Sequence, residues 1–100
     1  MPIPAGRLQE GAAEAAAAVF KALADPTRVE MVHFLRAAGG PICVCDFTAV
    51  FDLSQPTVSH HLAKLRDAGI VRVEKHGVWS FYQLRDDMPP QARAAIDAIA

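Results

Sequence analysis

The sequence has few of the features that mark secreted, membrane or disordered proteins. Its 100 residues include two cysteines and seven aromatic residues. The longest apolar run, Ala15–Phe20, is far shorter than the about 20 residues that a membrane-spanning helix needs. The N-terminal Met-Pro-Ile-Pro lacks the basic and apolar regions of a secretory leader. Cys43 and Cys45 are too few and too close for a disulfide framework, so we expect a single small cytoplasmic domain without a membrane partner.

An excess of positive charge is also missing. Ten Lys and Arg residues stand against eleven Asp and Glu residues, so bulk charge does not draw this protein to a polyanion. Hydrophobic residues make up 52% of the chain, and 19 of them are Ala, the residue with the highest helix propensity. The sequence contains neither a Gly-rich phosphate loop nor a recognisable catalytic constellation. We therefore expect a helical protein that is not an enzyme and has no organic cofactor.

The apolar spacing predicts a mainly α fold with one small β-hairpin. Apolar residues recur at helical intervals in five segments, whereas β-branched and bulky residues flank His76-Gly77 at a turn. In the first helix the apolar stripe consists of Leu8, Ala12, Ala15, Ala16, Val19 and Leu23. The predicted elements are a loose tail over 1–7, helices over 8–24, 26–38, 44–52, 55–68 and 91–100, and a hairpin over 71–84. Asp25 and Ser54 are predicted N-caps, each followed by a proline in the first helical turn.

The helix predicted over 55–68 presents a polar face opposite its Val58, Leu62 and Leu65 stripe. A short helix, a tight turn and this helix form a helix-turn-helix pattern, and the basic hairpin that follows is typical of a wing. We interpret the polar face as a reader of base edges in the major groove, with Lys and Arg side chains on phosphates. The predicted DNA-contacting residues are Gln55, Thr57, Ser59, His60, Lys64, Arg72, Lys75 and His76.

A solvated helix face is the alternative interpretation of these polar residues. Segment 54–77 argues against it, because it holds four Lys or Arg residues against two acids and three of the four histidines, while the rest of the chain is net acidic. A helical dimerisation module that uses the Ala-rich stripe without DNA is a further alternative, and only the near-neutral net charge supports it.

Four stretches together resemble the ArsR/SmtB family of bacterial metal-responsive repressors, and the likeness covers about residues 15–85. They are FKALADPTR at 20–28, CVCD at 43–46, LSQPTVSHHL at 53–62 and LRDAGIV at 65–71. The resemblance implies a winged helix-turn-helix homodimer whose first and last helices form the interface, with two recognition helices on a palindromic operator. It also places base and backbone contacts on Gln55, Thr57, Ser59 and His60. Many relatives carry Arg after the wing glycine where this chain has Val78, so Lys75 and His76 are the candidates for that contact.

The two cysteines are either small buried apolar residues or a ligand pair. On a regular helix, residues two apart point to nearly opposite sides, whereas two thiolates on one ion lie within about 4.6 Å of each other. Cys43 and Cys45 can then share an ion only if the first helical turn is unwound. We hypothesise that this deformation is the switch that lowers operator affinity.

The arsenic-responsive branch of the family implies a specific inducer for this pair. That branch carries a third Cys three residues after the second, and here the position holds Thr48. The resemblance therefore implies As(III) or Sb(III) on Cys43 and Cys45, with hydroxide, a small thiol or Thr48 as the third ligand. A dithiolate ion such as Hg(II) and a thiol redox or sulfide sensor of the same fold are the alternatives. A thiol oxidoreductase is disfavoured by the Cys-x-Cys spacing.

The sequence lacks the ligands of two other metal sites that occur in the family. The region 87–100 contains Asp87 and Asp97 but no His for a zinc site, and no Cys precedes Cys43 for a four-thiolate cadmium or lead site.

Overall fold

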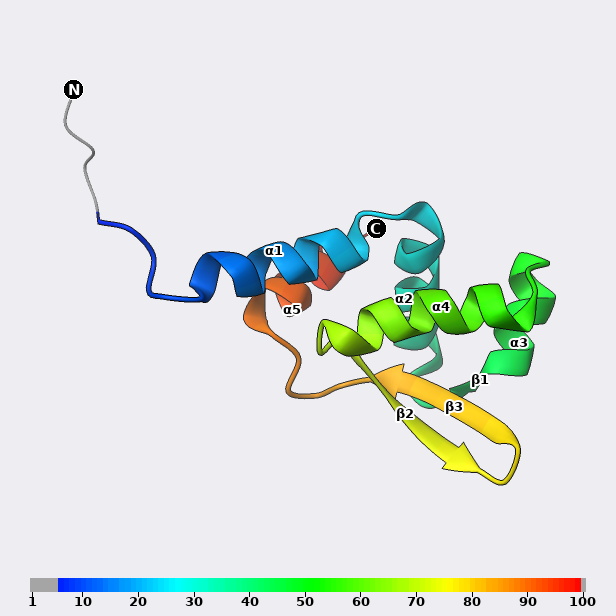
Figure 1. Ribbon diagram of the computed structural model, residues 1–100. Helices are drawn as coiled ribbons and strands as arrows, with labels where there is room; N and C mark the ends of the chain where they lie inside the picture. Colours follow the sequence, from blue (N-terminus) through cyan, green and yellow to red (C-terminus); the bar gives the residue numbers. More distant parts are fainter. Residues whose placement is uncertain (1–5, 100) are drawn as a thin grey trace.

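Five helices and a small antiparallel sheet make up the chain in the computed structural model, which describes residues 6–99 (Figure 1). Helices make up most of the chain, and the strands form one short piece and one hairpin. The elements are α1 (Ala12–Leu23), α2 (Pro26–Ala38), β1 (Ile42–Cys43), α3 (Val44–Phe51), α4 (Gln55–Asp67), β2 (Val71–His76), β3 (Trp79–Leu84) and α5 (Pro90–Asp97). The prediction of a mainly α fold with one hairpin over 71–84 is confirmed.

Two predicted caps start their helices as the sequence indicates. The Asp25 side chain accepts a hydrogen bond from the Arg28 backbone N–H at 3.1 Å, and Ser54 accepts one from the Thr57 N–H at 3.3 Å. Each satisfies one of the backbone donors that a helix N-terminus leaves free. Gly39 ends α2 in the left-handed region at φ 65°, a conformation that costs glycine little.

The first and last helices are shorter than predicted. Helix α1 begins at Ala12 rather than Leu8, because Gly11 lies in the left-handed region at φ 81° and breaks the helical path. Leu8 is therefore 69% exposed and takes no part in the buried stripe. Helix α5 ends at Asp97, and the tail predicted over 1–7 lies mostly outside the described residues, as does Ala100.

Strand β1 was not predicted. Ile42 and Cys43 pair with Tyr82 and Phe81 of β3, so the three-stranded antiparallel sheet has the order β1-β3-β2. Two residues are too few to show the alternation by which a strand is recognised in sequence. The pairing matters for the site, because it joins the cysteine segment to the middle of β3.

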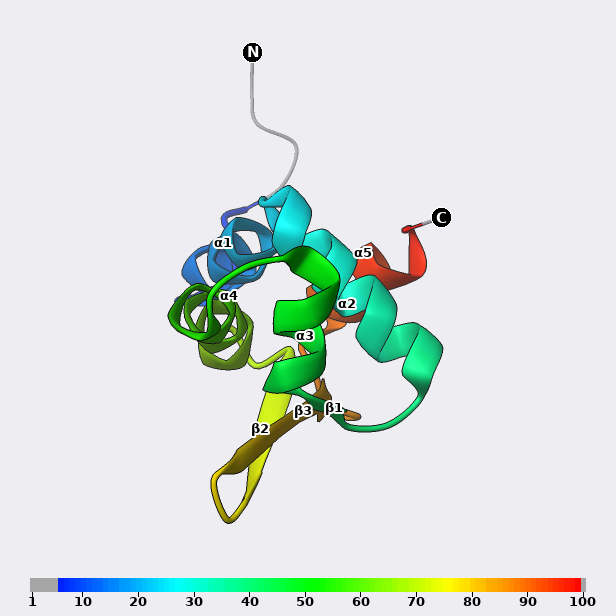
Figure 2. The same cartoon turned by 90° about the vertical axis from the view of Figure 1, so that its right-hand side faces the viewer.

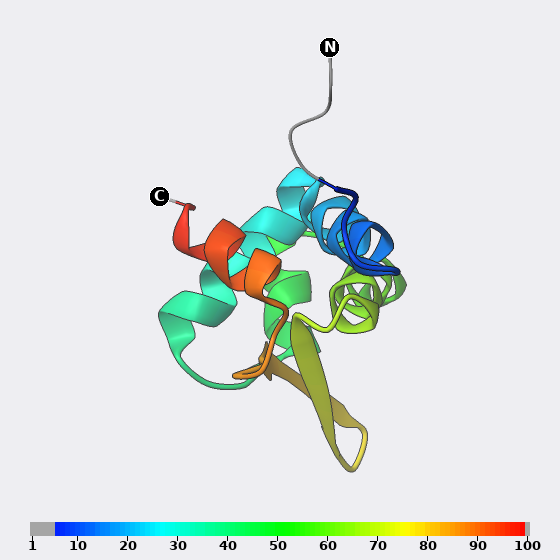
Figure 3. The same ribbon diagram turned by 90° about the vertical axis from the view of Figure 1, so that its left-hand side faces the viewer.

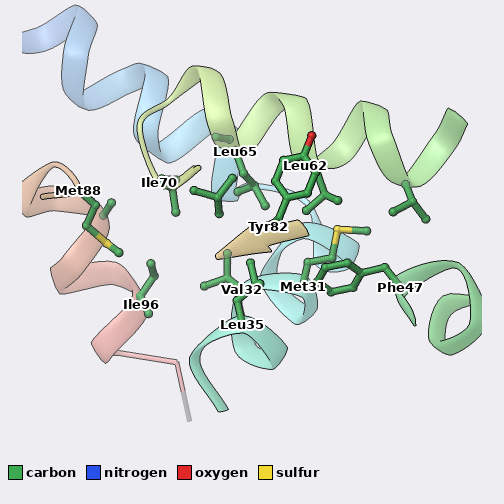
Figure 4. Close-up of a cluster of buried hydrophobic side chains, with 14 of the residues drawn as sticks. Met31, Val32, Leu35, Phe47, Leu62, Leu65, Ile70, Tyr82, Met88 and Ile96 are labelled. Carbon is green, nitrogen blue, oxygen red and sulfur yellow. The ribbon is translucent and has the colours of Figure 1, made fainter. Parts of the chain in front are cut away.

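The core lies between the helices and the inner face of the hairpin (Figure 4). Val58, Leu62 and Leu65 of α4 are fully buried, as their spacing predicts. They pack in one cluster with side chains from α2, α3, β3 and α5, chiefly Met31, Leu35, Phe47, Tyr82 and Ile96. Helix α4 is thus held by side chains that come before and after it in the chain.

The hairpin projects from the body at the end opposite to α1 and α5 (Figures 2 and 3). Helices α1 and α5 contact each other although they lie at the two ends of the described chain. None of the described helices is long and apolar enough to cross a bilayer.

The Asp25 cap predicts a pH-dependent contribution to stability. Its bond with the Arg28 N–H, together with the positive charge of Arg28 and His61, holds the pKa of Asp25 below the ordinary carboxyl value. The contribution is present above that ordinary value of about 3.9 and is lost as pH falls through the lowered pKa. Asp25→Ala should cost about 1 kcal/mol in urea unfolding at pH 7 and less at pH 3.

Asp25→Asn is the control for charge, since Asn also caps helices. Its loss at pH 7 should be smaller than that of Asp25→Ala, and both losses should fall by the same amount between pH 7 and pH 3, because neither replacement titrates. An Asp25→Ala loss of equal size at both pH values would contradict the assignment.

Candidate nucleic-acid interface

The outward face of α4 carries the predicted base-reading residues. With Val58, Leu62 and Leu65 buried, the helix turns Gln55, Thr57, His60 and Lys64 to the surface, and Ser59 is half-buried. All of them lie within the 13-residue helix, and four of the five are in its first two turns. This is the end of a recognition helix that contacts base edges in the major groove.

The cap at the start of α4 orders two of its hydroxyl groups. The Ser54 hydroxyl donates to the Thr57 hydroxyl oxygen at 2.9 Å while accepting from the Thr57 N–H. The Thr57 hydroxyl hydrogen therefore stays free to donate outward. The sequence predicts the Ser54 cap but not the hydrogen bond between the two hydroxyl groups.

The predicted wing residues fall on two faces of the hairpin. Successive residues of a strand alternate between faces, so Lys75 shares the inner face with Val71 and Val73, which pack towards the core. Arg72, Glu74 and His76 lie on the outer face. The structure thus brings Lys75 to the side of the recognition helix and separates it from Arg72 and His76.

Arg72 and His76 on the outer face already have partners within the hairpin. Arg72 lies opposite Gln83, whose side-chain oxygen, when turned towards the guanidinium, accepts from Arg72 Nε at 2.6 Å. His76 Nε2 lies 3.4 Å from a Glu74 carboxylate oxygen, and its ring packs edge-on against Phe81 at 5.6 Å. All four groups stay near the surface, where such pairs are weak and exchange readily for a phosphate.

Arg28 joins three helices and was missed by the sequence analysis. Its Nε donates to the Ala22 carbonyl at 2.6 Å at the end of α1, and its Nη1 lies 3.2 Å from His61 Nδ1 on α4. The first bond satisfies one of the carbonyls that a helix C-terminus leaves free. Lys21, Lys64 and the acidic Asp67 line the same groove, which lies between α1 and the C-terminal half of α4.

The cysteine pair lies at the junction of β1 and α3. Cys43 is the extended N-cap residue of α3 and is 6% exposed, while Cys45 lies exposed in the first turn. Their Cα atoms are 5.2 Å apart and their sulfur atoms are in disulfide contact. The Cys45 N–H also donates to Cys43 Sγ at 3.3 Å.

The expectation that α3 must unwind to bring the sulfurs together is wrong. It treats both residues as helical, whereas Cys43 has φ −69° and ψ 142° and belongs to β1. An extended residue followed by a helical turn places both sulfurs on one side without deformation.

The described residues offer two ligands for a thiophilic ion and no complete third. They contain no group of three or more Cys, His, Asp or Glu side chains that could hold a metal ion. Thr48, at the position of the third ligand, donates its hydroxyl hydrogen to the Cys45 carbonyl at 2.7 Å. The two cysteines can supply two thiolate ligands. An ion that forms three bonds would need a further ligand from another group.

A groove of about 250 Å³ connects the cysteines to the interface. Its lining comes from the segment where β1 meets α3, the first turns of α4, and the turn and third strand of the sheet. The lining residues are Cys43, Val44, Cys45, Thr48, Gln55, Ser59, Val78, Trp79, Ser80 and Tyr82. Two predicted base contacts, Gln55 and Ser59, therefore share a groove with the cysteine pair.

Known proteins match this chain along most of its length. A family model described as "Bacterial regulatory protein, arsR family" matches residues 25–73. An HTH-type transcriptional regulator from Methanocaldococcus jannaschii is 43% identical over 86 residues, which cover 86% of this chain and 96% of the relative. The chain belongs to the ArsR family.

Two further members of this comparison bear on function and fold. The arsenical resistance operon repressor of Escherichia coli is 43% identical over 79% of this ArsR-family chain, which spans 67% of that repressor. The homodimeric winged helix-turn-helix domain Mb0332 of Mycobacterium bovis has a TM-score of 0.71 at 24% identity, over 93% of this chain and 83% of that one. Family and fold are those of transcriptional regulators, not enzymes.

The recognition face predicts different effects for base-reading and phosphate-binding residues. His60→Ala should weaken binding to a selected operator roughly 10-fold or more and leave binding to random duplex nearly unchanged, because a lost base contact costs about 1–3 kcal/mol. Lys75→Ala should weaken both and reduce the salt slope by about one. Fluorescence anisotropy over a salt series, on an operator selected from random duplexes, measures these effects.

His33→Ala is the matched control, since His33 is an exposed histidine on α2. Operator affinity should not change in this variant. If His60→Ala also binds the operator like the wild type, the assigned reading face is wrong.

Proposed function

We propose that the protein is a homodimeric repressor that binds a palindromic operator and releases it when As(III) or Sb(III) binds Cys43 and Cys45. The observation that carries the proposal is the shared groove, because the cysteine pair and the operator-reading residues Gln55 and Ser59 line one cavity. A ligand on the sulfurs lies within the space that the DNA interface uses.

The exposed face of α1 supports the homodimer. Ala13, Ala17 and Phe20 lie on one stripe at helical spacing, and the Phe20 side chain is 54% exposed. Helix α5 packs beside α1 and exposes Ala94, and its C-cap residue Ala98 is also exposed. Small side chains of this kind let a second copy approach closely, and a two-fold dimer implies two matching half-sites in the DNA.

The chemistry of the pair supports a trivalent arsenic or antimony inducer. Cys43 and Cys45 would hold the ion as thiolates, the ligand type that soft ions prefer. The ion supplies stable bonds to sulfur when it is bound. The relatives in arsenic resistance, of which the E. coli repressor is one, favour this inducer over Hg(II).

Replacing one sulfur tests the inducer site. Cys45→Ser should bind the operator with wild-type affinity, because Cys45 is exposed and outside the core, but arsenite should release it only at concentrations at least 10-fold higher. Anisotropy of the protein–operator complex, titrated separately with arsenite, antimonite and Hg(II) after phosphine reduction, measures the release. Unchanged release by arsenite, or loss of operator binding in Cys45→Ser, would count against the proposal.

A thiol redox sensor is a second candidate, favoured by the contact between the two sulfur atoms. Peroxide would oxidise the two thiols to a disulfide and yield two water molecules. In this case peroxide releases the operator, a phosphine restores binding, and arsenite has no effect on the reduced protein. The same titration therefore separates the two candidates.

A further inference from the structure

We propose that Arg28 and a neutral His61 form a positioning pair, which links the recognition helix α4 to α1 and so keeps the two recognition helices of the dimer at the spacing of the operator half-sites. The inference rests on the homodimer and the two half-sites of the proposed function, but not on its inducer. Protonation of His61 breaks the pair, so operator binding depends on pH through a residue on the side of α4 that faces α2.

The guanidinium of Arg28 reaches from the end of α1 to the middle of α4. Its Nε donates to the Ala22 carbonyl at 2.6 Å, and its Nη1 lies 3.2 Å from His61 Nδ1. The Arg28 and His61 side chains are both half-buried, where a hydrogen bond is stronger than at a fully exposed site. Arg28 lies in the first turn of α2, and its backbone N–H donates to the Asp25 cap. One residue therefore bonds to three helices at defined positions.

Apolar contact does not fill the space beside this pair. A groove of about 230 Å³ lies next to the guanidinium, between α1 and the C-terminal half of α4. Three of its lining residues are alanines, whose side chains are too short to reach across it, and three are charged. Besides Arg28, the lining residues are Ala18, Lys21, Ala22, Lys64, Asp67 and Ala68. The angle between α1 and this end of α4 therefore depends on the polar pair.

This angle matters because α1 carries the exposed stripe at which a second copy docks in the proposed dimer. In a two-fold dimer, each recognition helix is placed relative to its partner through α1 of its own protomer. Two half-sites on DNA lie at one fixed separation, which both recognition helices must match at once. A loose link between α1 and α4 would thus weaken binding to two half-sites more than binding to one.

The chemistry of the pair requires a neutral His61. A guanidinium has only donors, so the contact is a hydrogen bond when Nδ1 of His61 carries no proton and Nε2 carries the single ring proton. A second proton turns both ring nitrogens into donors and brings two positive charges together. Because arginine keeps its charge over the whole range in which histidine titrates, the protonated ring must release Arg28.

Other charged groups around His61 do not replace the lost acceptor. Asp25 stays ionised at neutral and mildly acidic pH, because the bond from the Arg28 N–H and the charge of Arg28 lower its pKa. Its carboxylate attracts a protonated His61, but Oδ1 is already bonded to the Arg28 N–H. The further titratable or charged side chains near the pair are Lys21 on α1 and His60, Lys64 and Asp67 on α4. Protonation of His61 therefore leaves the Arg28 guanidinium without its bond to α4.

The test compares an operator of two half-sites with a duplex that carries one. The ratio of the two affinities reports how well both recognition helices fit at once, whereas a change in overall charge acts on both duplexes. With the wild-type dimer this ratio should fall roughly 10-fold between about pH 8 and about pH 5.5, the range in which histidine takes up its proton. Fluorescence anisotropy at constant ionic strength, with a phosphine present, measures both affinities.

His61→Asn separates the pair from the other titrating groups. The Asn Oδ1 accepts a hydrogen bond in place of Nδ1 and does not titrate. This variant should keep the wild-type ratio at pH 8 and change by less than about 2-fold at pH 5.5. His60 titrates in both proteins, so the difference between them belongs to His61. His33→Asn is the matched control, since His33 is an exposed histidine on the helix of Arg28, and it should show the full wild-type fall.

Arg28→Lys tests the other partner. It keeps the positive charge and the backbone bond to Asp25, but a single ammonium group cannot bond to Ala22 and His61 as the planar guanidinium does. Its ratio should be low at pH 8 and should not fall further at pH 5.5. Thermal unfolding monitored by circular dichroism verifies that the variants are folded. Imidazole ¹⁵N chemical shifts of the wild-type dimer at pH 8 should show the ring proton of His61 on Nε2.

The outcomes separate this inference from the function on which it rests. A wild-type ratio that does not change with pH, an equal fall in His61→Asn, or a wild-type ratio in Arg28→Lys at pH 8 overturns the inference, as does a ring proton on Nδ1. In each of these cases, a wild-type preference for the operator with two half-sites still supports the proposed homodimer. If the wild-type dimer shows no such preference at pH 8, the palindromic operator and the inference both fail.

Discussion

The burial of one apolar stripe fixes everything else at the interface. Val58, Leu62 and Leu65 are fully buried against α2, α3 and the hairpin, so α4 has no freedom to turn about its axis. Because helical residues three and four apart share a face, that constraint alone orients Gln55, Thr57 and His60 outward. Arg28 adds a polar tie from the end of α1 to His61 on the same helix. The position of the reading face therefore depends on packing that lies entirely behind it.

The short strand β1 has a similar role for the cysteines. Its pairing with β3 holds Cys43 in extended backbone at the point where α3 begins, and the helix then carries Cys45 round to the same side. The hairpin that provides the wing is thus bonded directly to the segment that provides the ligands. Trp79 and Tyr82 reach the groove from this sheet, and Gln55 and Ser59 reach it from α4. The buried apolar stripe of α4 and the backbone pairing of β1 with β3 therefore together position the residues that line this groove.

The sequence predicts most of this fold because its local signals agree with each other. Asp25, Ser54 and Gly39 mark helix ends by backbone chemistry, and the hairpin over 71–84 has the period of a strand. The errors occur where a single residue overrides a pattern: Gly11 breaks the stripe that includes Leu8, and β1 is too short to have a period. The candidate site is harder to predict. Which face of the hairpin holds Lys75 follows from alternation, but the meeting of Trp79, Ser59 and Cys43 depends on tertiary packing that no local pattern encodes.

A shared groove changes what the switch has to do. A ligand moves an equilibrium only by its difference in affinity for the two states. If an inducer had to unwind α3, the difference in its affinity for the two states would come from a strained helix. Part of its binding energy would then be lost to the deformation. With Cys43 already extended, the proposed switch needs no such deformation, and the difference would come from competition for the space beside Gln55 and Ser59. By linkage, operator binding then weakens the inducer by the same factor as the inducer weakens the operator. Because the proposed switch requires no second conformation of α3, it would leave the core that orients the recognition helix intact in both states.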